Sequence, residues 1–131
     1  DQKDIAGVFQ NFQYAYTFKD STIYGGLITS DFTFSYRDYD QGFDVTWGRD
    51  EDMRTTYGLF QNTQRLDLIW NNIVLITEDS LTANIVRSFN LTITFNPTDV
   101  VRVDGKVNLT LNKNIDSGVW RINKWIDESN F

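Results

Sequence analysis

The spacing of hydrophobic residues changes once along this chain, from a helical period to a strand period. In the first sixty residues apolar side chains recur every three or four positions, whereas from about residue 64 they alternate with polar ones. The first apolar stripe predicts an amphipathic helix and consists of Ile5, Val8, Phe9, Phe12 and Tyr16. Helices followed by long alternating strands are typical of an α+β fold.

The remaining elements follow from local signals. Asp20 is placed to cap a short helix over residues 21–28, although its two glycines each cost about 1 kcal/mol relative to alanine. Alternation predicts a first strand at 31–38, and a polar loop follows it. Three acidic residues at 50–52 then open a third helix, whose expected buried stripe is Met53, Tyr57 and Phe60. Four long strands are expected at about 64–77, 81–96, 100–113 and 118–127, with a bulge or tight bend as one interpretation of Asp104 and Gly105.

This order of elements predicts a single domain over residues 1–131. We expect the N-terminal helices to pack in the concave face of a long, curled, mixed but mostly antiparallel sheet. Such a sheet makes a cone with an open end, and therefore a pocket. A chain of 131 residues is long enough to bury a core without cross-links.

Composition excludes several classes of function. The net charge of -6 disfavours nucleic acid and anionic membranes as partners, and no segment is apolar enough for a membrane span. The absence of cysteine rules out disulfides and thiolate chemistry. The absence of histidine removes the commonest general base and metal ligand, so catalysis would depend on carboxylates, tyrosines or lysines. We expect no cofactor and no metal.

The first residues bear on localisation. The chain begins at Asp1, with no methionine, basic n-region or apolar h-region. Either a leader has been removed or the chain has been trimmed. The compartment stays open, with export to the periplasm or medium of a bacterium as one interpretation.

The order of five short segments along the chain is similar to that in a known family, although each segment alone is a weak signal. The segments are residues 19–20, 31–34, 47–50, 105–107 and 120–122. With them the chain resembles the NTF2-like superfamily, the cystatin-like cone fold shared by ketosteroid isomerase, scytalone dehydratase, SnoaL-type polyketide cyclases and nuclear transport factor 2. It looks most like the small stand-alone SnoaL-like domains. The resemblance implies a pocket inside the cone and a homodimer formed through the convex sheet face.

The catalytic residues of these enzymes are not matched. In ketosteroid isomerase an aspartate at a strand end removes a proton, while a tyrosine and a protonated aspartate hold the enolate oxygen. The resemblance places Phe12, Tyr36 and Thr110 at those positions, and related enzymes use histidines that this chain lacks. We therefore expect a module that binds a small molecule or provides a dimerising scaffold. The alternative is a lyase or isomerase with a carboxylate base in the cone.

Asp38 and Tyr16 are the candidate catalytic pair for that alternative. Asp38 shares a strand face with Tyr36, and Tyr16 follows Phe12 by one helical turn, so both side chains can reach the mouth of the cone. The other interpretation is that Asp38 belongs to a hydrated acidic turn and Tyr16 to the core. The acidic turn does not have the spacing of a calcium loop, because its twelfth position is Arg49.

Arg87 and Phe89 lie in a strand whose apolar face is expected to line the pocket. A guanidinium on that face needs a partner, so Arg87 either pairs with an acid such as Asp38 or Asp67 or binds a carboxylate or phosphate ligand. A bulge that returns Arg87 to solvent is a further alternative. The expected partner is thus a small apolar or anionic ligand.

Aromatic residues complete the predicted pocket. Tyr36, Trp47 and Trp70 can form flat walls at its mouth, with the core as the alternative location. Trp125 has the opposite strand parity to Trp120, which would expose one of them unless a bulge intervenes. The outward faces of the long strands are polar but nearly uncharged, which suits the homodimer.

Overall fold

Three helices and six strands make up the described part of the chain, residues 1–128. The structure, a computed structural model, describes residues 1–128 except for the side chain of Leu75. The helices are α1 (Ile5–Phe18), α2 (Ser21–Gly25) and α3 (Arg49–Asn62). The strands are β1 (Ile28–Asp38), β2 (Phe43–Gly48), β3 (Arg65–Glu78), β4 (Thr82–Asn96), β5 (Asp99–Lys113) and β6 (Trp120–Asp127).

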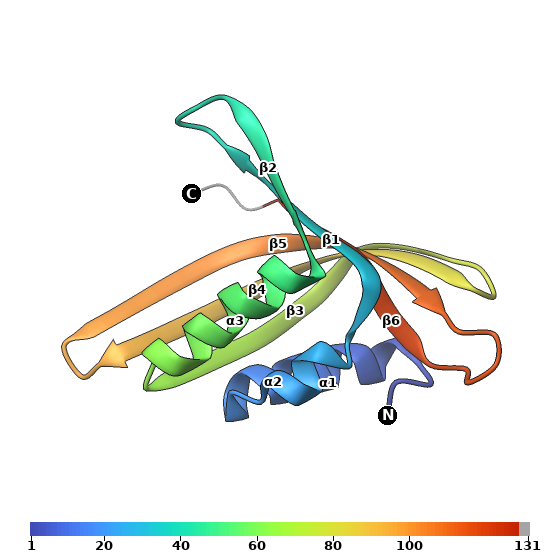
Figure 1. Ribbon diagram of the computed structural model, residues 1–131, viewed down its shortest axis with the longest axis horizontal. Helices are drawn as coiled ribbons and strands as arrows, with labels where there is room; N and C mark the ends of the chain where they lie inside the picture. Colours follow the sequence, from blue (N-terminus) through green and yellow to red (C-terminus); the bar gives the residue numbers. More distant parts are fainter. Residues whose placement is uncertain (129–131) are drawn as a thin grey trace.

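All six strands belong to one sheet with the order β2-β1-β6-β5-β4-β3. β1 runs parallel to β6, and every other neighbouring pair is antiparallel. The long strands β3 to β5 curve around the helices, which cover one face, while the β1–β2 hairpin projects away from them (Figure 1). This arrangement confirms the expected α+β class, with helices on the concave side of a mixed, mostly antiparallel sheet.

Helix α1 is held in place by its ends and its apolar stripe. Asp4 caps its first turn by accepting a hydrogen bond from the Gly7 amide at 2.6 Å, and Lys19 ends it in the left-handed conformation. Apolar side chains of α1, α2 and the concave sheet face form the core, which contains Val8, Phe12, Tyr24, Leu27, Phe32, Leu66, Ile85, Leu109 and Ile122.

Two expectations about local structure were wrong. The polar loop after β1 contains strand β2, which pairs with β1 and partly buries Val45 and Trp47. The predicted buried stripe of α3 was also wrong at Tyr57, although Phe60 is buried and Met53 packs against the core as expected. Asp52, Thr56 and Phe60 are buried, whereas Tyr57 is 53% exposed. Polar residues face inward here because Asp52 binds partners on α2 and β2.

An irregularity in β6 decides which way its side chains point. Ile122 pairs with Leu111 and Lys124 with Thr110, so Asn123 is an extra residue without a partner on β5. This bulge returns Trp125 to the face of Trp120 and Ile122, and removes the conflict that strict alternation predicts for the two tryptophans. At Asp104 and Gly105, by contrast, pairing between β4 and β5 continues without interruption.

Among residues 1–128, no helix has both the length and the apolar character needed to cross a bilayer.

Candidate functional site

A cavity of about 170 Å³ lies between α1 and the concave face of the sheet. Most of its wall is apolar or aromatic, and four strands and one helix contribute to it. The lining residues are Phe12, Tyr16, Leu68, Trp70, Phe89, Leu91, Val103, Val107, Trp125 and Asp127. Three of the predicted pocket residues, Tyr16, Trp70 and Phe89, are therefore brought together here.

The aromatic walls of the cavity support one another. The ring of Phe12 packs edge-on against Trp70 and Trp125, with centroids 5.4 Å away in both cases. Trp70 in turn packs against Phe89 at 6.2 Å and donates a 3.0 Å hydrogen bond from Nε1 to the Phe9 carbonyl. These contacts fix the orientation of the Trp70 wall before any ligand arrives.

Tyr16 lines the cavity and carries a hydroxyl group. Its side chain is 8% exposed, and within residues 1–128 its hydroxyl has no hydrogen-bond partner. Burial raises the pKa of Tyr16, and the nearby charge of Asp52 raises it further. Tyr16 consequently stays protonated and can donate a hydrogen bond throughout the physiological pH range.

Trp125 supplies a second donor. Its Nε1 atom is buried, and within the described residues it has no hydrogen-bond partner. The ring is held by Phe12 and by an edge-on contact with Phe34, whose centroid lies 5.0 Å away. A buried donor without an acceptor costs about 1 to 3 kcal/mol, which an acceptor oxygen in the cavity would recover.

Asp127 brings a carboxylate to the same cavity. It lies at the end of β6, opposite Val107 on β5 and Tyr36 on β1. Among the described lining residues it is the only acidic one. The cavity thus combines an apolar interior with two potential hydrogen-bond donors and one negatively charged acceptor.

Behind Tyr16 lies a buried polar cluster, which we define as Tyr24, Trp47, Asp52 and Thr56. Asp52 accepts hydrogen bonds from the Tyr24 hydroxyl at 2.5 Å and from Trp47 Nε1 at 3.0 Å. Burial raises the pKa of Asp52, while these hydrogen bonds and the charge of Arg49 oppose the rise. Burial, together with Tyr16 and Asp52, also raises the pKa of Tyr24.

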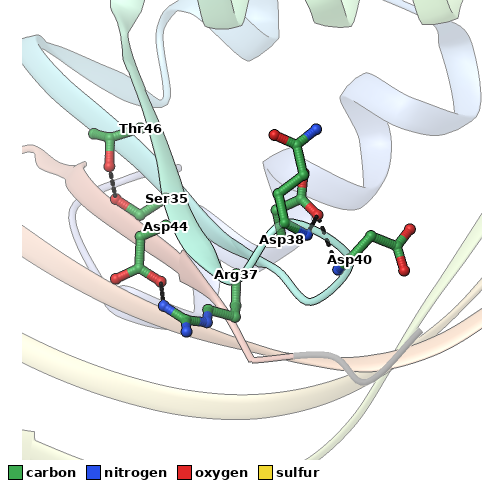
Figure 2. A network of polar contacts seen from close by, with 7 residues as sticks. Ser35, Arg37, Asp38, Asp40, Asp44 and Thr46 are labelled. Atoms are coloured by element: carbon green, nitrogen blue, oxygen red, sulfur yellow. Dashed lines mark hydrogen bonds and ion pairs between the residues drawn. The ribbon is translucent and has the colours of Figure 1, made fainter.

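Asp38 lies away from the cavity, in the turn of the β1–β2 hairpin. Figure 2 shows its carboxylate directed at the backbone of its own turn, where Oδ1 accepts hydrogen bonds from the amides of Asp40 and Gln41, both at 3.1 Å. Beside it Arg37 pairs with Asp44 at 3.3 Å. These contacts give Asp38 a structural role in the turn. The acidic residue that lines the cavity is Asp127, not Asp38.

Tyr36 and Trp47 also do not line the cavity. Trp47 stacks on Phe34 with 4.9 Å between centroids, and Tyr36 packs edge-on against Trp47 at 5.9 Å. Both contacts lie within the β1–β2 hairpin and pack its two strands together. Arg49 has a comparable structural role, because its Nη1 donates to the carbonyls of Gly25 and Ile28.

Arg87 shares the apolar face of β4 as expected but lies on the far side of Trp70 from the cavity. Its guanidinium stacks over the ring of Phe9 at 4.7 Å and donates from Nε to the Asn71 carbonyl at 2.7 Å. Neither Asp38 nor Asp67 forms an ion pair with it in residues 1–128.

Sequence reasoning missed Trp125 and Asp127 as site residues. Strict alternation from Trp120 directs both of them away from the core, and only the extra residue in β6 reverses that direction. The one signal available was the conflict between Trp120 and Trp125, since two tryptophans on opposite faces of a central strand are better explained by a bulge.

Comparison with solved structures shows the same architecture in proteins of low sequence identity. A protein from Novosphingobium aromaticivorans described as a candidate scytalone dehydratase is 19% identical, with a TM-score of 0.81 over 97% of this chain and 82% of its own. An NTF2-like superfamily protein from Salmonella enterica is 14% identical, with a TM-score of 0.76 over 99% and 91%. A protein with a cystatin-like fold from Caulobacter vibrioides is 15% identical, with a TM-score of 0.71 over 97% and 87%.

At these identities the likeness concerns the fold and leaves the ligand and the chemistry open. No protein-family model matches the chain, and no curated protein matches it significantly.

Proposed function

We propose that this protein, which has the NTF2-like fold, uses its cavity to bind a small, mainly apolar molecule that carries an acceptor oxygen. The observation that carries the proposal is an apolar cavity lined by Trp125, whose buried Nε1 has no hydrogen-bond partner among the described residues. A ketone, ester or phenol oxygen would accept from Trp125 and Tyr16, while rings or alkyl groups would pack against Trp70 and Phe89.

The volume limits the size of the ligand. An apolar cavity of about 150 Å³ is known to accommodate benzene, whereas typical pockets for drug-sized ligands exceed about 300 Å³. At about 170 Å³ this cavity suits a molecule of one ring or a short branched chain. We expect small cyclic ketones and phenols to bind more tightly than saturated hydrocarbons of the same volume.

Filling the cavity tests this proposal. Val103 lines it, so Val103→Phe should remove the space and weaken binding of cyclohexanone at least tenfold. Val100 lies on the same strand but is 46% exposed, and Val100→Phe is the matched control. Binding is measured by calorimetric titration, and both variants are checked for cooperative unfolding. Equal affinity of Val103→Phe and Val100→Phe would contradict the proposal, as would a complete lack of binding to the wild type.

A second candidate function is a proton-transfer reaction of the lyase or isomerase type. It is favoured by one observation: Asp127 and Tyr16 line the same cavity, so a carboxylate base and a hydroxyl donor are available to one substrate. Solved structures of this fold include a candidate dehydratase. The test is deuterium exchange at the carbon beside the carbonyl of cyclohexanone. Exchange that is no faster in the wild type than in Asp127→Asn would dismiss this function.

For the assembly we propose a homodimer through the convex face of the sheet. This face is polar, with asparagines bonded across strands, such as Asn84 to Asn108 at 2.7 Å, and with charges of both signs on β5, at Arg102, Asp104 and Lys106. Val86 lies in its middle, opposite Asn108. Sedimentation should give a dimer for the wild type and a monomer for Val86→Lys. A wild type that sediments as a monomer at 100 µM, roughly the upper range for a specific dimer, would exclude the proposal.

A further inference from the structure

A second hollow, distinct from the cavity, lies between α1 and the edge strand β3. It has a volume of about 270 Å³, and Trp70 separates it from the cavity. Its floor is apolar, made by Ala6, Phe9 and Trp70. Arg87 provides the only charge among its described lining residues.

The guanidinium of Arg87 is held in a fixed position without an acidic partner. It lies over the rings of Phe9 at 4.7 Å and Trp70 at 5.7 Å, and its Nε donates to the Asn71 carbonyl. The pairing of β3 with β4 is irregular between Trp70 and Ile73, which leaves this carbonyl to accept from a side chain.

These contacts use one of the five N–H groups of the guanidinium. Its two terminal nitrogens have no hydrogen bond or ion pair with any other residue of the described chain. The guanidinium is partly buried, and this burial lowers the pKa of Arg87 because a desolvated cation is less stable. An arginine stays charged in such surroundings, so an anion that reaches it gains more than it would at a fully hydrated surface.

The groups around Arg87 do not oppose an anion. Gln10 and Gln13 of α1 line the hollow with neutral amides, and Gln13 is anchored by a 2.9 Å hydrogen bond to the Leu68 carbonyl. Gln10 is exposed, and its amide can turn toward a ligand. Ile69, which is 56% exposed, extends the apolar floor outward.

We propose that this hollow is a binding site for a small carboxylate with an apolar body, such as an aryl or branched alkyl acid. The carboxylate forms paired hydrogen bonds with the terminal nitrogens of Arg87, and the apolar body lies against Phe9, Trp70 and Ile69. A planar carboxylate matches the fork of a guanidinium that is already fixed by stacking. The site is independent of the ligand proposed for the cavity.

Benzoate is the probe, and benzamide is its neutral counterpart of equal shape. Titrations followed by NMR should show benzoate shifting the side-chain amide signals of Gln10 and Gln13, with benzamide at least tenfold weaker. The titrations are repeated in Val103→Phe, in which the cavity is filled. There the benzoate affinity should stay within twofold of the wild type, which separates this site from the cavity.

Two variants identify the charge that binds. Arg87→Gln should weaken benzoate binding at least tenfold. Because Arg87→Gln also loses packing, Gln10→Glu is the second test. It leaves Arg87 in place and adds a negative charge beside the negatively charged benzoate, so it should weaken benzoate binding at least threefold. Gln61→Glu makes the same charge change on the exposed face of α3 and should have no effect. Benzoate binding that is unchanged in both Arg87→Gln and Gln10→Glu would overturn the proposal, as would equal affinity for benzamide.

Discussion

At the scale of single residues, the buried carboxylate of Asp52 is the most consequential group outside the cavity. It is 4% exposed, and both of its oxygens accept hydrogen bonds, one from Tyr24 and one from Trp47. A charge this deeply buried is tolerated only when it is fully hydrogen-bonded. Asp52 therefore fixes the start of α3 against α2 and β2, and it places a negative charge near Tyr16.

Removing the Tyr24 hydroxyl should destabilise the protein in a pH-dependent manner. Hydrogen bonds to charged groups contribute about 1.5 to 3 kcal/mol, so Tyr24→Phe should lose about that much unfolding free energy at pH 8. The pKa of Asp52 is already raised in the folded state, so its contribution to stability is present at low pH and is lost as the pH rises through that pKa. Without Tyr24 the pKa rises further, and the loss at pH 8 should exceed the loss at pH 4.

Urea denaturation at the two pH values measures this effect. Tyr57→Phe is the matched control, because Tyr57 lies on α3 but is 53% exposed. It should change the unfolding free energy by less than about 0.5 kcal/mol. If Tyr24→Phe behaves like Tyr57→Phe at both pH values, Asp52 does not have the role assigned to it.

At the scale of elements, the bulge in β6 determines the composition of the cavity. Asn123 has no partner on β5, and the residues after it resume regular pairing. Deleting Asn123 should therefore give an uninterrupted strand that still directs Trp125 and Asp127 inward. Deleting Arg121, two positions earlier, should instead expose Ile122 and bury Asn123, because a one-residue shift exchanges the faces of a strand.

We expect these two deletions of equal length to differ strongly. Loss of Asn123 should cost no more than about 2 kcal/mol, the range of an ordinary local change. Loss of Arg121 should cost about 3 to 5 kcal/mol, comparable to removing a large core side chain. Chemical denaturation followed by tryptophan fluorescence gives both values. Similar losses for the two deletions would show that Asn123 is not the extra residue that sets the faces of β6.

The same bulge marks the limit of what the sequence could predict. Strand alternation predicted Phe89 on the pocket lining, helical spacing predicted Tyr16 there, and Trp70 was predicted as an aromatic wall; all three line the cavity. Parity failed after Asn123, because a bulge of this type leaves only a weak signal in composition. Asp38 does not line the cavity for a different reason: it lies at the end of β1, in a hairpin formed by the unpredicted β2.

At the scale of the whole molecule, the curved sheet and the N-terminal helix create the cavity jointly. α1 contributes Phe12 and Tyr16, and the four strands β3 to β6 contribute the opposite wall. Pattern reasoning could establish this architecture because the change from a helical to a strand period is long and uniform. The size of the cavity could not be predicted, since it depends on how completely the aromatic rings fill the space.

The most direct test of the central claim is the NMR signal of the Trp125 indole N–H during titration with cyclohexanone. The claim predicts a downfield shift of this proton as the ketone oxygen accepts its hydrogen bond. The signals of Trp47 and Trp70 should move little, because their N–H groups already bind Asp52 and the Phe9 carbonyl. A Trp125 signal that does not move at saturating ketone, or moves no more than those of Trp47 and Trp70, would contradict the account.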